Sequence, residues 1–172
     1  MSKVISLREV ISALEDASDE CSSYLDPETG EIILVTEEER LLAEREDPED
    51  DDAEDDDSED DDSEDDDDEE IPAWQRELIP KIRAALEGDR WLELPDRFDI
   101  HEWSIMERFS REQNIERIRK GLLNAIHGAG AFSAFRSAIR ILGLEQSWYQ
   151  FRDEALADIA RDWLEEHKLQ YK

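Results

Sequence analysis

The sequence is poor in cysteine, and this excludes two kinds of structure. Cys21 is the only cysteine among the 172 residues, so the chain forms no internal disulfide and no four-cysteine metal site. Proteins of reducing compartments typically lack disulfides. We therefore predict a reducing environment for this chain.

Long apolar segments are also lacking. The longest aliphatic run covers residues 32–35, whereas a membrane-spanning helix needs roughly 20 apolar residues. Residues 1–10 have no extended apolar core of the kind that marks a secretory signal peptide. We predict a soluble, cytoplasmic protein with no membrane partner.

Local motifs for metals and cofactors are absent. His101, His127 and His167 are too widely spaced for a ligand motif, and no cysteine pair accompanies them. Gly128 and Gly130 precede a predicted helix, but no Lys-Ser or Lys-Thr pair follows them as in a phosphate-binding loop. We predict neither a metal nor a cofactor, and we assign these glycines to helix ends.

Negative charge is concentrated in one segment. The formal net charge is −30, and residues 46–70 contain 21 Asp or Glu and no basic residue. Residues 1–45 hold 12 acids against 4 bases, and residues 71–172 hold 17 against 16. A polyanion without an apolar face cannot offset by burial the entropy of ordering it. We predict an N-terminal part (1–45), a disordered polyacidic linker (46–70) and a helical body (71–172).

The role of this acidic segment stays open at the level of sequence. A solubilising linker is the simplest interpretation. Diffuse binding of divalent cations, imitation of a nucleic-acid backbone, and shielding of basic residues elsewhere in the chain are the alternatives.

The N-terminal part has the pattern of a helix, a hairpin and a second helix. Ser6 with Glu9, and Thr36 with Glu39, have the spacing of a capping box, in which two side chains each accept a backbone N–H. Between them, the stretch SSYLDPETGEIILVT places a Pro-Glu-Thr-Gly turn between two apolar runs. This arrangement is typical of a β-hairpin.

The C-terminal part shows helical periodicity almost throughout. Apolar residues recur at helical spacing in segments 72–87, 99–109, 115–126, 132–142 and 148–163, which predicts about five helices. Pro80 is expected to kink or divide the first, and Asp99 with Glu102 to cap the second. Residues 91–94 are predicted to form a strand that joins the hairpin. The expected fold class is α+β, mostly helical, with a small antiparallel sheet.

Four runs in this sequence resemble one bacterial family. YLDPETGE, LELPDRFDIHEWSIMERF, AIHGAGAFSAFR and WYQFRDEALADIARDWLEE resemble the uncharacterised protein family zero-one-five-eight, over nearly the whole chain except the acidic segment. The resemblance implies no particular activity. Where family members often have a basic run similar to GRGAFRRFKD, this chain has Ala129, Ser133, Ala134 and Ser137, and only Arg136 keeps a basic position.

Basic residues gather around two predicted helices with the outline of a helix-turn-helix. Residues 115–152 carry six basic side chains against two acidic ones, a local charge of +4. We expect Arg136 and Arg140 to share the face opposite the phenylalanines, with Lys120 and Arg152 nearby, as candidate contacts for phosphates. The alternative, a helical hairpin with a solvated polar side, is favoured because no long basic patch is present.

A second group of polar residues has the chemistry of an acid–base site. Asp96, Asp99, His101 and Glu102 place carboxylates and an imidazole within seven residues, and such groups transfer protons when a cleft shifts their pKa. The favoured alternative is that Asp99 and Glu102 serve a helix start. The tryptophans and neighbouring aromatic residues fall mostly on apolar stripes, which favours core packing over a base-stacking surface.

These patterns lead to three functional hypotheses. The first is a non-enzymatic cytoplasmic interaction or regulatory protein, with an unknown protein partner and an acidic segment that tunes binding. The second is a nucleic-acid-binding protein whose Arg136 and Arg140 face is masked by residues 46–70. The third is an enzyme with its site at residues 96–102. Strong capping and packing patterns without a complete catalytic motif favour the first hypothesis.

Overall fold

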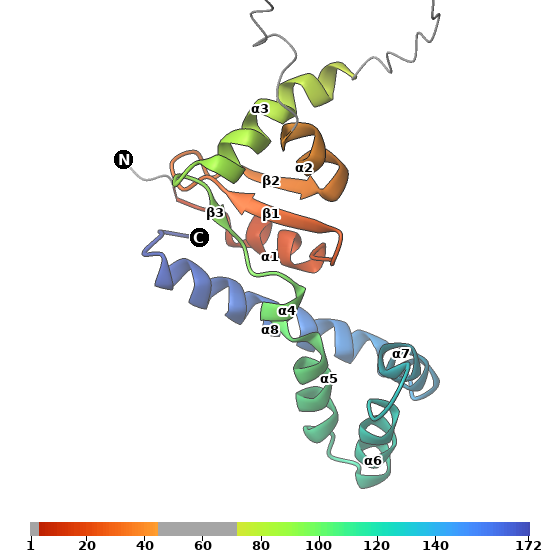
Figure 1. Ribbon diagram of the computed structural model, residues 1–172. Helices are drawn as coiled ribbons and strands as arrows, with labels where there is room; N and C mark the ends of the chain where they lie inside the picture. Colours follow the sequence, from red (N-terminus) through yellow and green to blue (C-terminus); the bar gives the residue numbers. More distant parts are fainter. Residues whose placement is uncertain (1–3, 45–71) are drawn as a thin grey trace, which may run out of the picture.

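The computed structural model describes residues 4–44 and 72–172, with a small sheet at one end and helices at the other (Figure 1). The elements, in chain order, are α1 (Leu7–Glu15), β1 (Cys21–Leu25), β2 (Ile32–Thr36), α2 (Glu37–Glu44), α3 (Ala73–Glu87), β3 (Leu92–Glu93), α4 (Arg97–Ile100), α5 (Glu102–Arg111), α6 (Glu116–Ala125), α7 (Ala131–Ile141) and α8 (Glu145–Glu166). The fold is α+β and mostly helical, as predicted. The predicted linker, residues 46–70, lies outside the described residues.

The sheet forms as the turn chemistry predicts. β1 and β2 pair antiparallel, with Leu25 opposite Ile32, and Gly30 in the turn between them has a φ of 71°, which L side chains rarely adopt. β3 pairs with the other edge of β1, which gives the strand order β2-β1-β3. The strand predicted within residues 91–94 therefore joins the hairpin.

Alternation along the strands sends neighbouring side chains to opposite faces of the sheet. Tyr24 and Ile33 pack in a cluster with residues of α2 and α3. Leu25 and Ile32 instead pack in a larger cluster with residues of α1 and α8. Both faces of the sheet are therefore covered by helices (Figure 1).

The long helix α8 extends past the sheet and carries the helical end of the molecule, formed by α5, α6 and α7 (Figure 1). Aromatic rings of α5, α7 and α8 meet edge to face at Phe109, Phe135, Trp148 and Phe151. One continuous cluster of buried apolar residues includes both Val10 of α1 and Phe135 of α7. The sheet end and the helical end therefore share one core.

Side-chain caps fix two helix starts where the sequence predicts them. Glu9 donates its backbone N–H to Ser6 Oγ at 3.3 Å. Glu39 donates its N–H to Thr36 Oγ1 at 3.3 Å, and Thr36 returns its own N–H to Glu39 Oε2 at 2.9 Å. Pro80 lies within α3 without dividing it.

The capping box predicted at Asp99 and Glu102 is wrong. Asp96 caps α4 by accepting from the N–H groups of Phe98 and Asp99, and Asp99 Oδ2 accepts from the Asp96 N–H at 3.3 Å. His101 then adopts a positive φ of 50°, which ends α4 and starts α5. The segment predicted as one helix is therefore two.

A buried carboxylate ties the hairpin turn to the loop between α3 and β3. Asp26 is 2% exposed and accepts from Thr29 Oγ1 at 2.7 Å, from the Glu28 N–H at 2.9 Å and from Arg90 Nε at 2.9 Å. Burial raises the pKa of this carboxyl group, but the donors, Arg90 foremost, outweigh burial and hold the pKa of Asp26 at about 2. The ion pair therefore joins the two described parts of the chain.

Candidate functional site

A hollow of about 240 Å³ lies between α5, α7 and α8, and we call it the helical hollow. Its apolar floor consists of buried side chains, namely Met106, Phe135, Ile139 and Trp148. Its rim is polar or aromatic and consists of Glu102, Phe132, Arg136, Tyr149 and Arg152. The three helices thus bring together residues that are far apart in the sequence.

The floor of the helical hollow is held by aromatic packing. The ring centroids of Phe135 and Trp148 are 4.9 Å apart at an interplanar angle of 76°, which is an edge-to-face contact. Phe109 lies beneath them, with its centroid 5.4 Å from that of Trp148 and 6.2 Å from that of Phe135. These contacts fix the floor in one arrangement.

The rim of the helical hollow carries one uncompensated positive charge. Arg152 Nε donates to Glu102 Oε1 at 3.0 Å, and both side chains are half-buried. Arg136 makes no hydrogen bond or ion pair with any residue in the described part of the chain. Two guanidinium groups against one carboxylate leave a net charge of +1 at this rim.

Two of the four predicted binding residues lie elsewhere. Lys120 pairs with Glu116 along α6 at 2.7 Å, and Arg140 pairs with Glu145 at 3.4 Å. Arg136 was expected on the face opposite the phenylalanines, but it lines the helical hollow with Phe132 and Phe135. That expectation is wrong because α7 places Arg136 at the border of its apolar face, one helical turn after Phe132.

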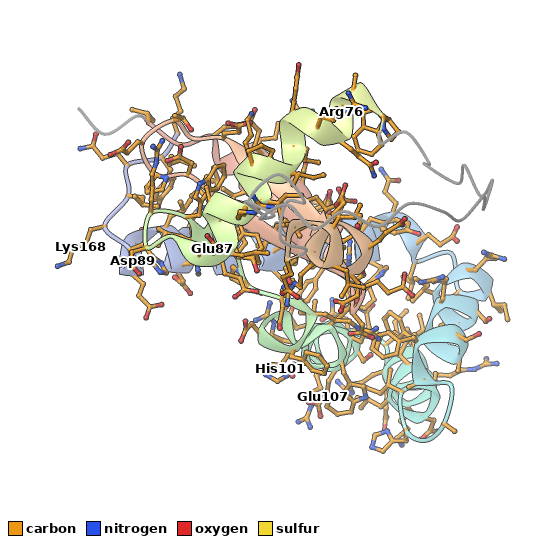
Figure 2. All side chains as sticks on the ribbon, turned by 45° about the horizontal axis from the view of Figure 1, so that its top comes forward. Arg76, Glu87, Asp89, His101, Glu107 and Lys168 are labelled. Carbon is orange, nitrogen blue, oxygen red and sulfur yellow. The ribbon has the colours of Figure 1, made fainter. Side chains whose placement is uncertain are left out.

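The four predicted acid–base residues are divided between hollows. Asp96 and Asp99 line a hollow of about 480 Å³ between the start of α4 and the last turns of α8. His101 and Glu102 line a third hollow, of about 250 Å³, beside the helical hollow. His101 is exposed and lies at the margin of the molecule (Figure 2).

The largest of these three hollows is acidic. Its carboxylates come from two regions that are distant in sequence, and they are Glu93, Asp96, Asp99, Asp162 and Glu166. His167 stacks on Trp163 with ring centroids 4.3 Å apart, and its Nδ1 lies 2.8 Å from the Trp163 carbonyl oxygen. Within residues 4–44 and 72–172, no group of three or more His, Cys, Asp or Glu is arranged to hold a metal ion.

Phe132 and Tyr149 line the helical hollow, and Phe98 and Trp103 line the hollow beside it; all four are exposed, and we call this set the aromatic rim. Phe98 is 72% exposed and Tyr149 is 53% exposed. The Arg97 guanidinium lies over the Phe132 ring, 5.6 Å from its centroid. Core packing, predicted for the tryptophans and neighbouring aromatic residues, is confirmed for Trp148 and Trp163 but is wrong for Trp74, Trp103 and Tyr149.

Sequence reasoning missed Phe132 and Tyr149 as site residues. Phe132 follows a helical apolar pattern, so periodicity assigns it to the core, and Tyr149 is weighed only with the neighbouring aromatic residues, for which core packing is favoured over base stacking. The pairing of Glu102 with Arg152 spans 50 residues and has no local signal at all.

These features define an α+β protein with an aromatic, arginine-lined hollow at its helical end. A family model described as "Uncharacterised protein family (UPF0158)" matches residues 62–172, and the chain belongs to this family. It is 31% identical over 94 residues to the UPF0158 protein PA5073 of Pseudomonas aeruginosa. These 94 residues make up 53% of this chain and 61% of that protein. The match thus spans less than two thirds of the relative.

No solved structure matches this chain. Across the described residues, no helix combines the length and the apolar character that a bilayer crossing needs.

Proposed function

We propose that this chain is a non-enzymatic, cytoplasmic interaction protein that binds a partner protein through its helical end. The observation that carries the proposal is the helical hollow, with its apolar floor and the exposed aromatic rim around it. Tyrosine, tryptophan and arginine are the residues that most often dominate the energy of protein interfaces. Here Tyr149 and Arg136 line a concave apolar surface, and Trp103 lines the hollow beside it.

The polar groups near the aromatic rim support binding more than catalysis. Asp96 and Asp99 accept backbone hydrogen bonds at the start of α4, and Glu102 accepts from Arg152. These contacts give each of the three carboxylates a structural role. The enzyme hypothesis has less support, because its four side chains line different hollows.

Photo-crosslinking tests this proposal. With p-benzoylphenylalanine at position 98, on the aromatic rim, we expect a discrete crosslinked product in living cells. Position 74 is the control, because Trp74 is 59% exposed but lies on α3 at the sheet end. Tyr149→Ala should reduce the yield at position 98 by about fivefold or more, since it removes an interface anchor. Equal yields at both positions, or no effect of Tyr149→Ala, would contradict the proposal.

Nucleic-acid binding is the second candidate function, and one observation favours it. Residues 117–144, which include most of α6 and all of α7, contain no Asp or Glu, although the chain has 50 of them. The pairing of Lys120 with Glu116 and of Arg140 with Glu145 weakens this candidate, since those cations are already compensated.

Deleting residues 46–70 tests the second candidate. If these residues mask a basic surface, the deletion should create DNA or RNA affinity that falls steeply with salt, because bound phosphates release counterions. Arg136→Ala combined with Arg140→Ala should abolish that gain. Filter binding between 50 and 200 mM salt, a range over which phosphate contacts weaken by orders of magnitude, measures the effect. Absence of binding at the lower salt concentration would exclude this function.

A further inference from the structure

We propose that the helical hollow binds the C-terminal residue of a partner protein, with the carboxylate on Arg136 and the apolar side chain on the floor. The inference rests on the proposed function, because it names the chemistry that an interaction at the helical end would recognise. Its basis is the combination of volume, charge and floor composition in one hollow.

The volume of the hollow limits the size of the bound group. Its volume of about 240 Å³ is below the roughly 300–1,000 Å³ of sites that enclose drug-sized ligands. A single amino-acid residue matches this hollow better than a nucleotide or a large cofactor does. The bound group is therefore of residue size.

The net charge of +1 at the rim of the helical hollow favours a ligand with one negative charge. Arg152 forms an ion pair with Glu102, whereas Arg136 has no ion-pair or hydrogen-bond partner in the described ranges 4–44 and 72–172. A guanidinium presents parallel N–H donors that match the two oxygens of a carboxylate. Arg136 therefore supplies the geometry as well as the charge for a carboxylate.

The closeness of Arg136 to the apolar floor favours a ligand that carries both groups on one residue. Arg136 lines the same small hollow as Phe135 and Ile139, which are almost fully buried. An internal residue of a peptide carries an apolar or an acidic side chain, but not both. A hydrophobic C-terminal residue carries an apolar side chain and a carboxylate on the same Cα.

A path for the preceding residues of the partner lies next to the helical hollow. The neighbouring hollow of about 250 Å³ shares Glu102 and Phe132 with it and is also lined by Phe98 and Trp103. Residues before the terminus would lie across these exposed aromatic side chains. A peptide should therefore bind more tightly than a free acid with the same terminal group.

Peptide binding to the full chain tests the inference. The probes are acetyl-Gly-Ser-Gly-Ser-X peptides with X as Leu, Ile, Phe or Trp, each as free acid and as amide. Calorimetry should show at least one free acid binding about tenfold or more tightly than its amide, because amidation removes the charge-assisted hydrogen bonds. The free acid 3-phenylpropionate should bind about tenfold more weakly than the best peptide, since it lacks contacts with the neighbouring hollow.

Matched variants separate recognition from folding. Arg136→Gln should weaken the free acid about tenfold and leave the amide unchanged, whereas Arg136→Lys should retain part of the affinity. Arg140→Gln removes the same charge one helical turn later, outside the hollow, and should have no effect. The thermal midpoint of Arg136→Gln should equal that of the wild type, since Arg136 is exposed and unpartnered in the described part of the chain.

Four results would overturn the inference. Three are the absence of binding by every free-acid peptide, equal binding of acid and amide, and an unchanged affinity in Arg136→Gln. The fourth is binding of 3-phenylpropionate as tight as that of the peptides, because the ligand would then be a free small carboxylate. If position 98 still captures a partner in cells, such a failure removes only this inference. Loss of that capture removes the proposed function itself.

Discussion

Asp26→Asn should lower the free energy of unfolding by about 2 kcal/mol at neutral pH. The pKa of Asp26 falls from an ordinary value of 3.8 to about 2 in the folded chain, and each unit of difference corresponds to about 1.4 kcal/mol. The cause is the pairing of a buried carboxylate with Arg90, Thr29 and the Glu28 N–H. Urea unfolding followed by far-ultraviolet circular dichroism measures the loss.

The pH dependence of this loss has a definite sign. Because folding lowers the pKa of Asp26, its stabilisation is fully present above the ordinary value of 3.8 and is lost as the pH falls towards about 2. The unfolding free energies of wild type and Asp26→Asn should therefore converge between these two pH values. A deficit of the variant that persists unchanged at the lower pH would contradict this cause.

An exposed ion pair provides the control. Asp19 pairs with Arg97 at 2.8 Å, but both side chains are about half exposed. Asp19→Asn should therefore change stability by less than about 0.5 kcal/mol. If both aspartate variants lost the same stability, burial of Asp26 would not be the reason.

Phe109→Ala should lower the free energy of unfolding by about 3–5 kcal/mol, the largest effect expected for a single substitution here. Phe109 is 3% exposed, and its ring meets those of Phe135, Trp148 and Phe151. Truncation removes apolar area and leaves a cavity at the centre of the helical end. Urea unfolding followed by tryptophan fluorescence measures the loss, since Trp148 is in the cluster.

Two further variants make the Phe109 result interpretable. Phe109→Leu retains most of the volume and should cost less than about 2 kcal/mol, which keeps the protein folded for measurement. Phe98→Ala removes an aromatic ring of the same size from a side chain that is 72% exposed, and should cost less than about 0.5 kcal/mol. A loss in Phe98→Ala as large as that in Phe109→Ala would contradict the assigned core.

The hairpin and most helix ends are predictable because their causes are local. The turn at Gly30 needs a residue that tolerates a positive φ, and the caps at Ser6 and Thr36 need particular side chains three residues before a glutamate. Sequence spacing contains this information. The addition of β3 to the hairpin also follows, since a short apolar run bounded by turn residues needs a sheet edge.

The error at α4 arose from two capping patterns of equal spacing. Asp96 precedes Asp99 by three residues, and Asp99 precedes Glu102 by three. The choice depends on His101, whose left-handed backbone separates α4 from α5. Histidine permits this conformation without requiring it, so the break has no decisive signal in the sequence.

The site was harder to predict because its geometry is tertiary. Periodicity gives the buried face of α7 but not the position of Arg136 at the border of that face. The ion pair between Glu102 and Arg152 joins α5 to α8 and depends on how these helices pack. The Arg140 and Lys120 charges were predicted without their partners, because a local charge count does not show which acids each cation contacts.

The length of α8 determines how far a tilt at one end would move the other end. Its 22 residues form a rod of about 33 Å at the usual rise per residue, with α1 packed on one part and the helical hollow on another. A tilt of about 5° at the sheet end would displace the opposite tip by about 3 Å, as the length of such a rod dictates. If α8 moved as a rigid body, a small adjustment at the sheet end would thus shift its part of the helical hollow by about 3 Å.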